Sequence, residues 1–258
     1  MTNIYIATHK CYDFPTGYIP IHVGKALGGG ELGILGDDSG DSISVLNKSF
    51  CELTALYWIW KNDLSRGDDI VGMVHYRRYF KSNGKYQYLK GKKIASMFDF
   101  SELLNGVDII VPEKNRFFGM TLSEQYAKYH NKADLDITRS VIEDMYPEYI
   151  FYFDSVMNES ISSFCNMFVS KKNIIDGYFE WLFSILFEVR SKVDIEHYDD
   201  YQKRIFGFLS ERLFNVWLER NKCIYKINYR KVIEIEPTPL VLRFKKYFKR
   251  TLFFFGLK

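Results

Sequence analysis

The chain has 258 residues, of which 47% are hydrophobic and 26% charged, a balance that excludes an intrinsically disordered protein. Its formal net charge of +3 is too small to indicate nucleic-acid binding without a clustered basic patch. The length allows one large domain or two small ones, and no linker rich in Pro, Gly or Ser divides it.

The first half of the chain alternates short apolar runs with helical patterns. In chain order, we predict a strand at 4–7, a long loop rich in Gly and Asp at 12–44, an amphipathic helix at 49–63, a strand at 70–76, a helix at 100–105 and a strand at 107–112. This order of strands and helices predicts an α/β fold with a mixed, mainly parallel sheet flanked by helices.

The second half is predicted to be mostly helical. The pattern gives a helix at 136–145 closed by Pro147, a short strand at 164–169, and helices at 173–190 and 201–220. We therefore expect one domain over residues 1–240, followed by a basic, aromatic tail at 241–258.

The tail has a composition that suits a membrane surface. Residues 243–258 contain six basic side chains and no acidic one, interleaved with aromatic rings, and they are too few to span a bilayer. A basic tail folded onto its own domain is the alternative. The N-terminus shows no secretory signal and the four cysteines have no metal-binding spacing, so we expect a cytoplasmic protein that contacts the inner face of the membrane through its tail.

The strand at 70–76 ends abruptly in His75, Arg77 and Arg78. In open α/β sheets the carboxyl ends of strands face the ligand crevice, and the planar guanidinium group of arginine suits phosphate oxygens. We therefore expect both arginines to bind a diphosphate and His75 to orient one of the reacting groups. A structural ion pair with nearby carboxylates is the alternative.

Polar residues follow the other predicted strands as well. Thr8, His9 and Lys10 leave the first strand, and Glu113 and Lys114 follow the strand at 107–112. The chain has no GxGxxG or GxxxxGK[ST] motif that would supply a phosphate cradle elsewhere. Together these strand ends predict a phosphate-bearing ligand.

A metal-dependent sugar transferase with such a sheet normally carries Asp-x-Asp at the second strand end, because two carboxylates hold Mg²⁺ or Mn²⁺ against the diphosphate. Here that place is taken by residues 75–78, whose arginines would neutralise the leaving diphosphate instead. We predict no metal site and no cofactor, although the turn with Asp37, Asp38 and Asp41 leaves Mg²⁺ or Mn²⁺ open.

A catalytic base would be a carboxylate or a histidine beside the acceptor hydroxyl. Glu211 is the first candidate, because it lies on the polar side of a helix whose other face is strongly apolar. A surface glutamate paired with a neighbouring arginine is the alternative. Asp154, His130 and Asp134 are further candidates.

Several segments together resemble the bacterial DUF4422 family. They are 7–10 (ATHK), 18–24 (YIPIHVG), 38–44 (DSGDSIS), 51–54 (CELT), 57–58 (YW), 74–80 (VHYRRYF), 166–168 (NMF) and 204–213 (RIFGFLSERL). The resemblance covers roughly residues 3 to 236. The family occurs in capsule, exopolysaccharide and O-antigen gene clusters and is regarded as one of glycosyltransferases.

The resemblance implies a GT-A-like nucleotide-diphosphosugar fold. Some members are associated with galactofuranose transfer, which makes UDP-galactofuranose a candidate donor. The segment 207–212 is similar to the one that supplies the base of inverting galactosyltransferases, but Arg212 replaces the second acidic residue, which puts the role of Glu211 in doubt.

These considerations assign roles to individual residues. Glu211, His75 and Asp154 are predicted to be catalytic, and His130 and Asp134 to bind the acceptor. Donor-binding residues are predicted to be Thr8, His9, Lys10, Tyr18, His22, Asp41, Asn47, Arg77, Arg78 and Asn166, with the ring of Tyr18 stacking on the base.

The predicted function is an inverting transfer of a sugar from a UDP-sugar to a lipid-linked or oligosaccharide acceptor of a surface polysaccharide. The alternative is a noncatalytic carbohydrate-binding or scaffold module of a polysaccharide assembly complex, which would use its aromatic-rich surface as sugar platforms.

Overall fold

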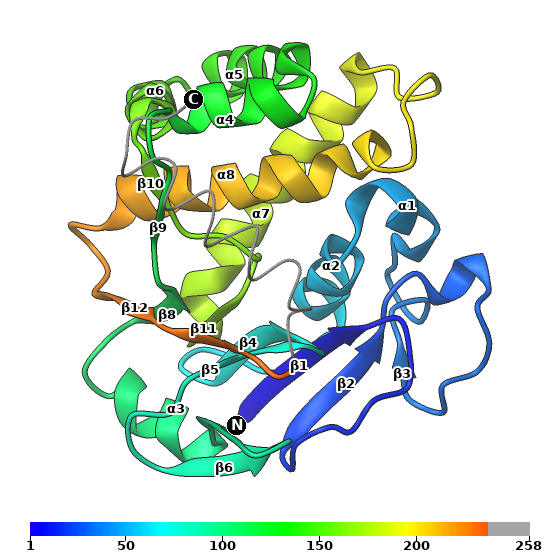
Figure 1. Ribbon diagram of the computed structural model, residues 1–258, viewed down its shortest axis with the longest axis vertical. Coiled ribbons are helices and arrows are strands. Elements are labelled where there is room, and N and C mark those ends of the chain that lie inside the picture. The colour runs from blue at the N-terminus through cyan, green and yellow to red at the C-terminus, as the bar shows by residue number, and fades with distance from the viewer. Residues whose placement is uncertain (237–258) are drawn as a thin grey trace, which may run out of the picture.

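The computed structural model describes residues 1–236 (Figure 1). Its strands are β1 (Thr2–Thr8), β2 (Tyr18–His22), β3 (Leu35–Gly36), β4 (Ile70–His75), β5 (Arg78–Phe80), β6 (Tyr86–Leu89), β7 (Lys92–Ala95), β8 (Ile109–Pro112), β9 (Asn115–Arg116), β10 (Ile161–Ser162), β11 (Phe168–Lys171), β12 (Ile227–Arg230) and β13 (Val232–Glu234). The helices are α1 (Asn47–Phe50), α2 (Leu53–Asn62), α3 (Met97–Leu104), α4 (Leu122–Tyr129), α5 (Lys132–Met145), α6 (Ile150–Asn158), α7 (Lys172–Lys192) and α8 (Ile205–Asn221).

The central sheet has the strand order β12-β8-β11-β4-β1-β2-β3, with β5 and β13 attached beside β4. Four neighbouring pairs are parallel, namely β1 with β2, β1 with β4, β2 with β3, and β8 with β12. Strand β11 lies between β4 and β8 and runs antiparallel to both. The predicted α/β fold with a mixed, mainly parallel sheet is confirmed.

Alternation along β1 divides the core into two layers. Tyr5 and Ala7 face the larger cluster, which includes α2, α7 and α8, whereas Ile4 and Ile6 face a smaller cluster with α3 and the β6–β7 hairpin. Helices α4, α5 and α6 form a further layer over α7 and α8 (Figure 1). The sheet therefore has both faces covered, and a ligand can reach it only from its edges or ends.

Some predicted elements differ from the structure. The segment 12–44, expected to be a loop, contains β2, which pairs with β1 along its whole length. The helix predicted at 49–63 is divided into α1 and α2 at Cys51, whose φ of 52° is left-handed. The strand predicted at 164–169 begins only at Phe168, because Cys165 and Asn166 have φ values of 88° and 45°.

The predicted membrane contact of the tail at 241–258 lies outside the described residues. Within residues 1–236, no helix is both long and apolar enough to cross a membrane.

Candidate active site

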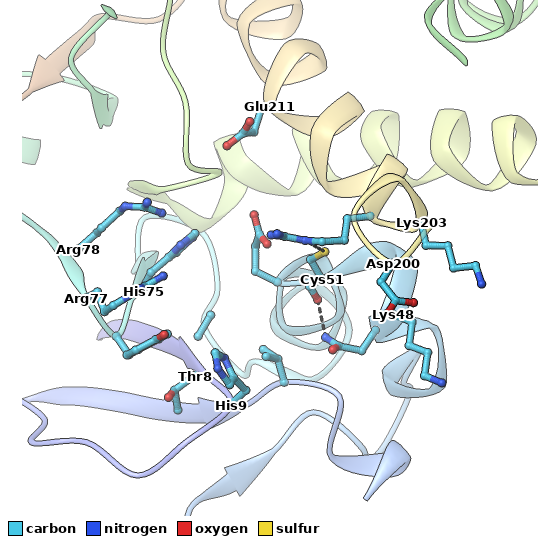
Figure 2. Close-up of a pocket in the computed structure, with 16 residues that line it drawn as sticks. Thr8, His9, Lys48, Cys51, His75, Arg77, Arg78, Asp200, Lys203 and Glu211 are labelled. Atoms are coloured by element: carbon cyan, nitrogen blue, oxygen red, sulfur yellow. Dashed lines mark hydrogen bonds between the residues drawn. The ribbon is translucent and has the colours of Figure 1, made fainter. Parts of the chain in front are cut away.

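A cavity of about 730 Å³ lies at the carboxyl ends of β1 and β4, beneath α8 (Figure 2). Ligand pockets commonly have volumes of roughly 300–1,000 Å³. The cavity is lined by Ala7, Thr8, His9, Val23, Asn47, Lys48, Cys51, Glu52, His75, Tyr76, Arg77, Arg78, Asp200, Lys203, Arg204 and Glu211. Seven of the predicted site residues thus lie around one cavity: Thr8, His9, Asn47, His75, Arg77, Arg78 and Glu211.

Both arginines at the end of β4 line the cavity, and both also contact carboxylates. Arg77 Nη1 lies 3.5 Å from Glu236 Oε2, and Arg78 Nε lies 3.4 Å from Glu234 Oε1. Figure 2 shows them on one side of the cavity with His75. Because surface ion pairs of this kind contribute only about 0–1 kcal/mol, a ligand phosphate could replace the carboxylates at little cost.

His75 is held as a neutral imidazole. Burial lowers its pKa to about 3, and the positive charges of Arg78 and Arg77 act in the same direction. Its Nε2 atom is buried and has no hydrogen-bond partner. An uncharged ring with a free nitrogen can accept or donate one hydrogen bond to a bound ligand.

Acidification should destabilise the protein partly through His75. Its pKa of about 3 in the folded state is below the ordinary value of 6.5, so the unfolded chain takes up the proton first and stability falls as pH drops through this window. Between these two pKa values the free energy of unfolding should fall by on the order of 1 kcal/mol per pH unit. Urea unfolding at pH 7, 5.5 and 4 measures the free energy of unfolding. As pH falls, this free energy should decrease less for His75→Asn than for the unmodified protein. His197→Asn, at an exposed position, is the control; the same loss in all three proteins would contradict the assignment.

The floor of the cavity is formed by the last residue of β1 and the residues that follow it. Thr8 is buried and its hydroxyl donates to the carbonyl of Lys10 at 2.7 Å, which closes a tight turn. The pKa of His9 is lowered by burial and then by Lys10 and Arg77. Lys10 itself lies just outside the lining, with Nζ 5.1 Å from the ring centre of Tyr76. The turn therefore places His9 in the cavity lining, while the Thr8 hydroxyl is used within the turn itself.

The break between α1 and α2 brings in a second carboxylate, which the sequence did not predict. Glu52 accepts a hydrogen bond from Asn166 Nδ2 at 2.8 Å, and burial raises its pKa. Asn166 therefore does not line the cavity but holds Glu52 from behind. Asn47 closes the same break, donating to the carbonyl of Cys51 at 2.7 Å and to Thr54 Oγ1 at 3.1 Å.

Glu211 projects from α8 into the cavity from above (Figure 2). Its Oε1 accepts from the amide of Cys165 at 2.9 Å, and its Oε2 lies 3.3 Å from Arg212 Nη1. Burial raises its pKa, against the opposing effects of Arg212 and the Cys165 amide, while Glu52 adds to the rise. A carboxylate with a raised pKa is suited to take up a proton near neutral pH.

Arg212 lies behind Glu211 and does not reach the cavity lining. It is buried, donates to Gln125 Oε1 at 2.6 Å and to the carbonyl of Phe208 at 2.9 Å, and so fixes the position of Glu211. The replacement of an acidic residue by Arg212 thus gives Glu211 a positioning contact from the next residue of α8, and Gln125 of α4 holds that arginine in turn.

A second group of cations lies on the opposite side of the cavity, where the sequence had predicted none. Lys48 and Lys203 line this side together with Asp200 (Figure 2). Arg204 joins them, and its Nε lies 3.3 Å from Cys51 Sγ. Cys51 and Arg204 stand in segments that resemble the family, and that resemblance was the one signal that could have found them.

Three residues predicted to bind the donor lie away from the cavity. Tyr18 is buried in β2 and its hydroxyl donates to the carbonyl of Ala95 at 2.8 Å, so its ring is not available to stack on a base. His22 is buried in the same strand. Asp41 accepts from the hydroxyl of Tyr57 at 3.1 Å in an exposed turn.

The three predicted residues of the helical layer also lie elsewhere. Asp154 makes a two-point ion pair with Arg139, at 2.8 Å for each contact. His130 stacks on Phe208 with ring centroids 4.0 Å apart, and Asp134 is buried and accepts from the hydroxyl of Tyr198 at 2.8 Å. These contacts account for each side chain as part of the fold.

The Asp-rich turn does not gather its carboxylates. Asp37 is buried and accepts from the amide of Gly24 at 2.8 Å and from the hydroxyl of Ser44, whereas Asp38 faces Lys25 at 3.8 Å. In the part of the chain that the structure describes, no three His, Cys, Asp or Glu side chains are grouped as metal ligands would be.

Comparison with known proteins gives two matches. The family model described as "Domain of unknown function (DUF4422)" matches residues 3–222. A solved structure titled "WbbM bifunctional glycosytransferase apo structure" is similar, with 29% sequence identity and a TM-score of 0.80. The match covers 92% of this chain and 45% of that one, so this chain spans less than half of its length. No similar protein was found among curated sequences.

Proposed function

The chain belongs to the DUF4422 family, and from this premise and the cavity described above we propose that it is a glycosyltransferase. It would move a sugar from a UDP-sugar to a lipid-linked or oligosaccharide acceptor of a bacterial capsule, exopolysaccharide or O-antigen. The observation that carries the proposal is a single cavity in which arginines from the end of β4 face a carboxylate from α8. The similarity to a structure titled as a glycosyltransferase supports it.

The donor would lie across the ends of β1 and β4. Arg77 and Arg78 would neutralise the charge that develops on the leaving diphosphate, while Thr8 and His9 hold the nucleoside and His75 orients one of these groups. UDP-galactofuranose is the candidate donor, on the resemblance alone. The proposed transferase domain is residues 1–240, with the basic tail at the membrane surface.

Glu211 would act as the general base. It takes the proton from an acceptor hydroxyl, whose oxygen attacks the anomeric carbon while the bond from that carbon to the diphosphate oxygen breaks. UDP leaves with the electron pair of that bond. A single displacement of this kind inverts the configuration at the anomeric carbon.

Transfer and UDP binding can be measured on the same preparation. Incubation with a panel of UDP-sugars and a synthetic lipid-linked acceptor should yield one product heavier by one sugar, detected by mass spectrometry, and calorimetry should show UDP binding. Transfer activity should persist in EDTA. If EDTA abolishes transfer and Mn²⁺ restores it, the proposal that transfer needs no metal ion is refuted. A folded protein that binds sugar but neither UDP nor any donor would instead support the noncatalytic module.

A further inference from the structure

The β6–β7 hairpin lies at one end of the long axis of the molecule (Figure 1). Its outer face is aromatic. Tyr86 and Tyr88 share one side of β6, are 47% and 62% exposed, and have ring centroids 5.4 Å apart. Phe98, at the start of α3, is 55% exposed. Three large rings this exposed within one short segment mark a surface that contacts a partner.

The same segment is strongly basic. Residues 81–98 contain five lysines and no aspartate or glutamate. Lys93 Nζ lies 4.3 Å from the ring centre of Tyr86, and Lys85 Nζ lies 5.5 Å from that of Phe98. Lys90 contacts a carboxylate, Asp13, at 3.8 Å. Lys85 and Lys93 therefore place their ammonium groups beside the exposed rings, and the outer face combines rings with cations.

The fold does not need these rings. The inner face of the hairpin is formed by Leu89 and Ile94, which are buried in the smaller core cluster and attach the hairpin to the sheet. Because successive residues of a strand point to opposite faces, burial of Leu89 leaves Tyr86 and Tyr88 outside. The two tyrosine rings are therefore exposed because of their position in the strand, and not because the core is incompletely packed.

We propose that the outer face of this hairpin binds the surface of an anionic phospholipid bilayer. Tyrosine and phenylalanine rings favour the boundary between headgroups and acyl chains, and lysines beside them are attracted by anionic headgroups. The lysine stems can extend along the rings and keep their ammonium groups at headgroup level.

The end of the described chain lies beside the hairpin. Glu236 accepts a hydrogen bond from the Tyr12 hydroxyl at 2.6 Å, and Lys92 Nζ donates to the carbonyl of Glu234. The basic, aromatic sequence 243–258 lies outside the described residues and is a separate candidate for membrane contact. Lasting attachment to a membrane commonly needs two such signals, and the hairpin would supply the second.

Vesicle sedimentation of the full chain tests this proposal. Binding should be strong to vesicles with anionic phosphatidylglycerol, weak to vesicles of phosphatidylcholine alone, and reduced by salt. Each lysine at the surface contributes roughly fivefold to binding, so Lys85→Glu, Lys90→Glu and Lys93→Glu together should weaken it by roughly a hundredfold or more. The matched control reverses Lys128, Lys132 and Lys192, three exposed lysines of α4, α5 and α7, and should bind as before.

A second measurement does not depend on removing charge. Tyr88→Trp should gain fluorescence that brominated lipids quench. The unmodified protein should show little quenching, because Trp58, Trp181 and Trp217 are buried and the half-buried Trp60 stacks on Phe183 on the opposite face of the sheet. Equal binding by the hairpin and control variants, or no added quenching in the Tyr88→Trp variant, would overturn the proposal and leave the tail as the membrane contact. Binding is measured without donor or acceptor, so failure here does not bear on sugar transfer.

Discussion

Replacing Glu211 with glutamine should lower kcat for sugar transfer by about 10²–10⁴-fold, the usual contribution of a general base, and leave UDP affinity unchanged. Glutamine keeps the length of the side chain and an oxygen that can accept from the Cys165 amide, but it cannot take a proton. Its amide group would face Arg212 Nη1 less favourably, so the melting temperature of the variant has to be measured beside its activity.

The control for this change is Asp154→Asn. Asp154 was also a candidate base, but it pairs with Arg139 in the helical layer, so this variant should transfer sugar at the normal rate. Because burial raises the pKa of Glu211 above its ordinary 4.5, kcat of the unmodified protein for the proposed transfer should fall with decreasing pH through that raised value. Retained activity in Glu211→Gln would reject Glu211 as the base and point to Glu52.

The strands and helices with strong periodicity could be predicted from the sequence, and those that depend on neighbouring segments could not. β1, β4, α7 and α8 each carry a continuous apolar run or a clear helical face. β2 was missed because Pro20 interrupts it, and a proline normally argues against a strand inside a sheet. The antiparallel insertion of β11 between β4 and β8 leaves no local signal, since it depends on pairing across the chain.

The same distinction between local pattern and dependence on neighbouring segments holds for the residues of the site. Arg77, Arg78 and Thr8 could be predicted because they directly follow strong strands, whose ends have a known place in such a sheet. The periodicity gave no sign of Glu52, because it reaches the cavity only through the left-handed backbone at Cys51, which divides what the sequence pattern shows as one helix; the family-like segment 51–54 was the one signal that could have found it. Tyr18 was misplaced for a related reason. A ring in a loop is available for stacking, but the same ring in β2 belongs to the core.

The double replacement Arg77→Ala and Arg78→Ala should abolish measurable UDP binding. A hydrogen bond to a charged group typically contributes about 1.5–3 kcal/mol, so removing either arginine alone should raise the Kd for UDP by about 10-fold or more. Transfer should fall further than binding, because the charge on the leaving diphosphate grows in the transition state. Calorimetry with UDP, with circular dichroism to check the fold, measures the effect.

A matched variant distinguishes the two possible roles of these arginines, which are structural ion pairing and diphosphate binding. If they serve only as ion pairs, Glu234→Gln with Glu236→Gln should harm the protein as much as removing the arginines, because the same contacts are lost. If they bind a diphosphate, the glutamine variant frees both guanidinium groups and UDP affinity should stay the same or rise. Weaker UDP binding in the glutamine variant than in the unmodified protein would contradict the diphosphate role. If UDP affinity is kept, each carboxylate acts as a substitute for phosphate in the empty protein. It holds its arginine ordered until the donor diphosphate displaces the carboxylate.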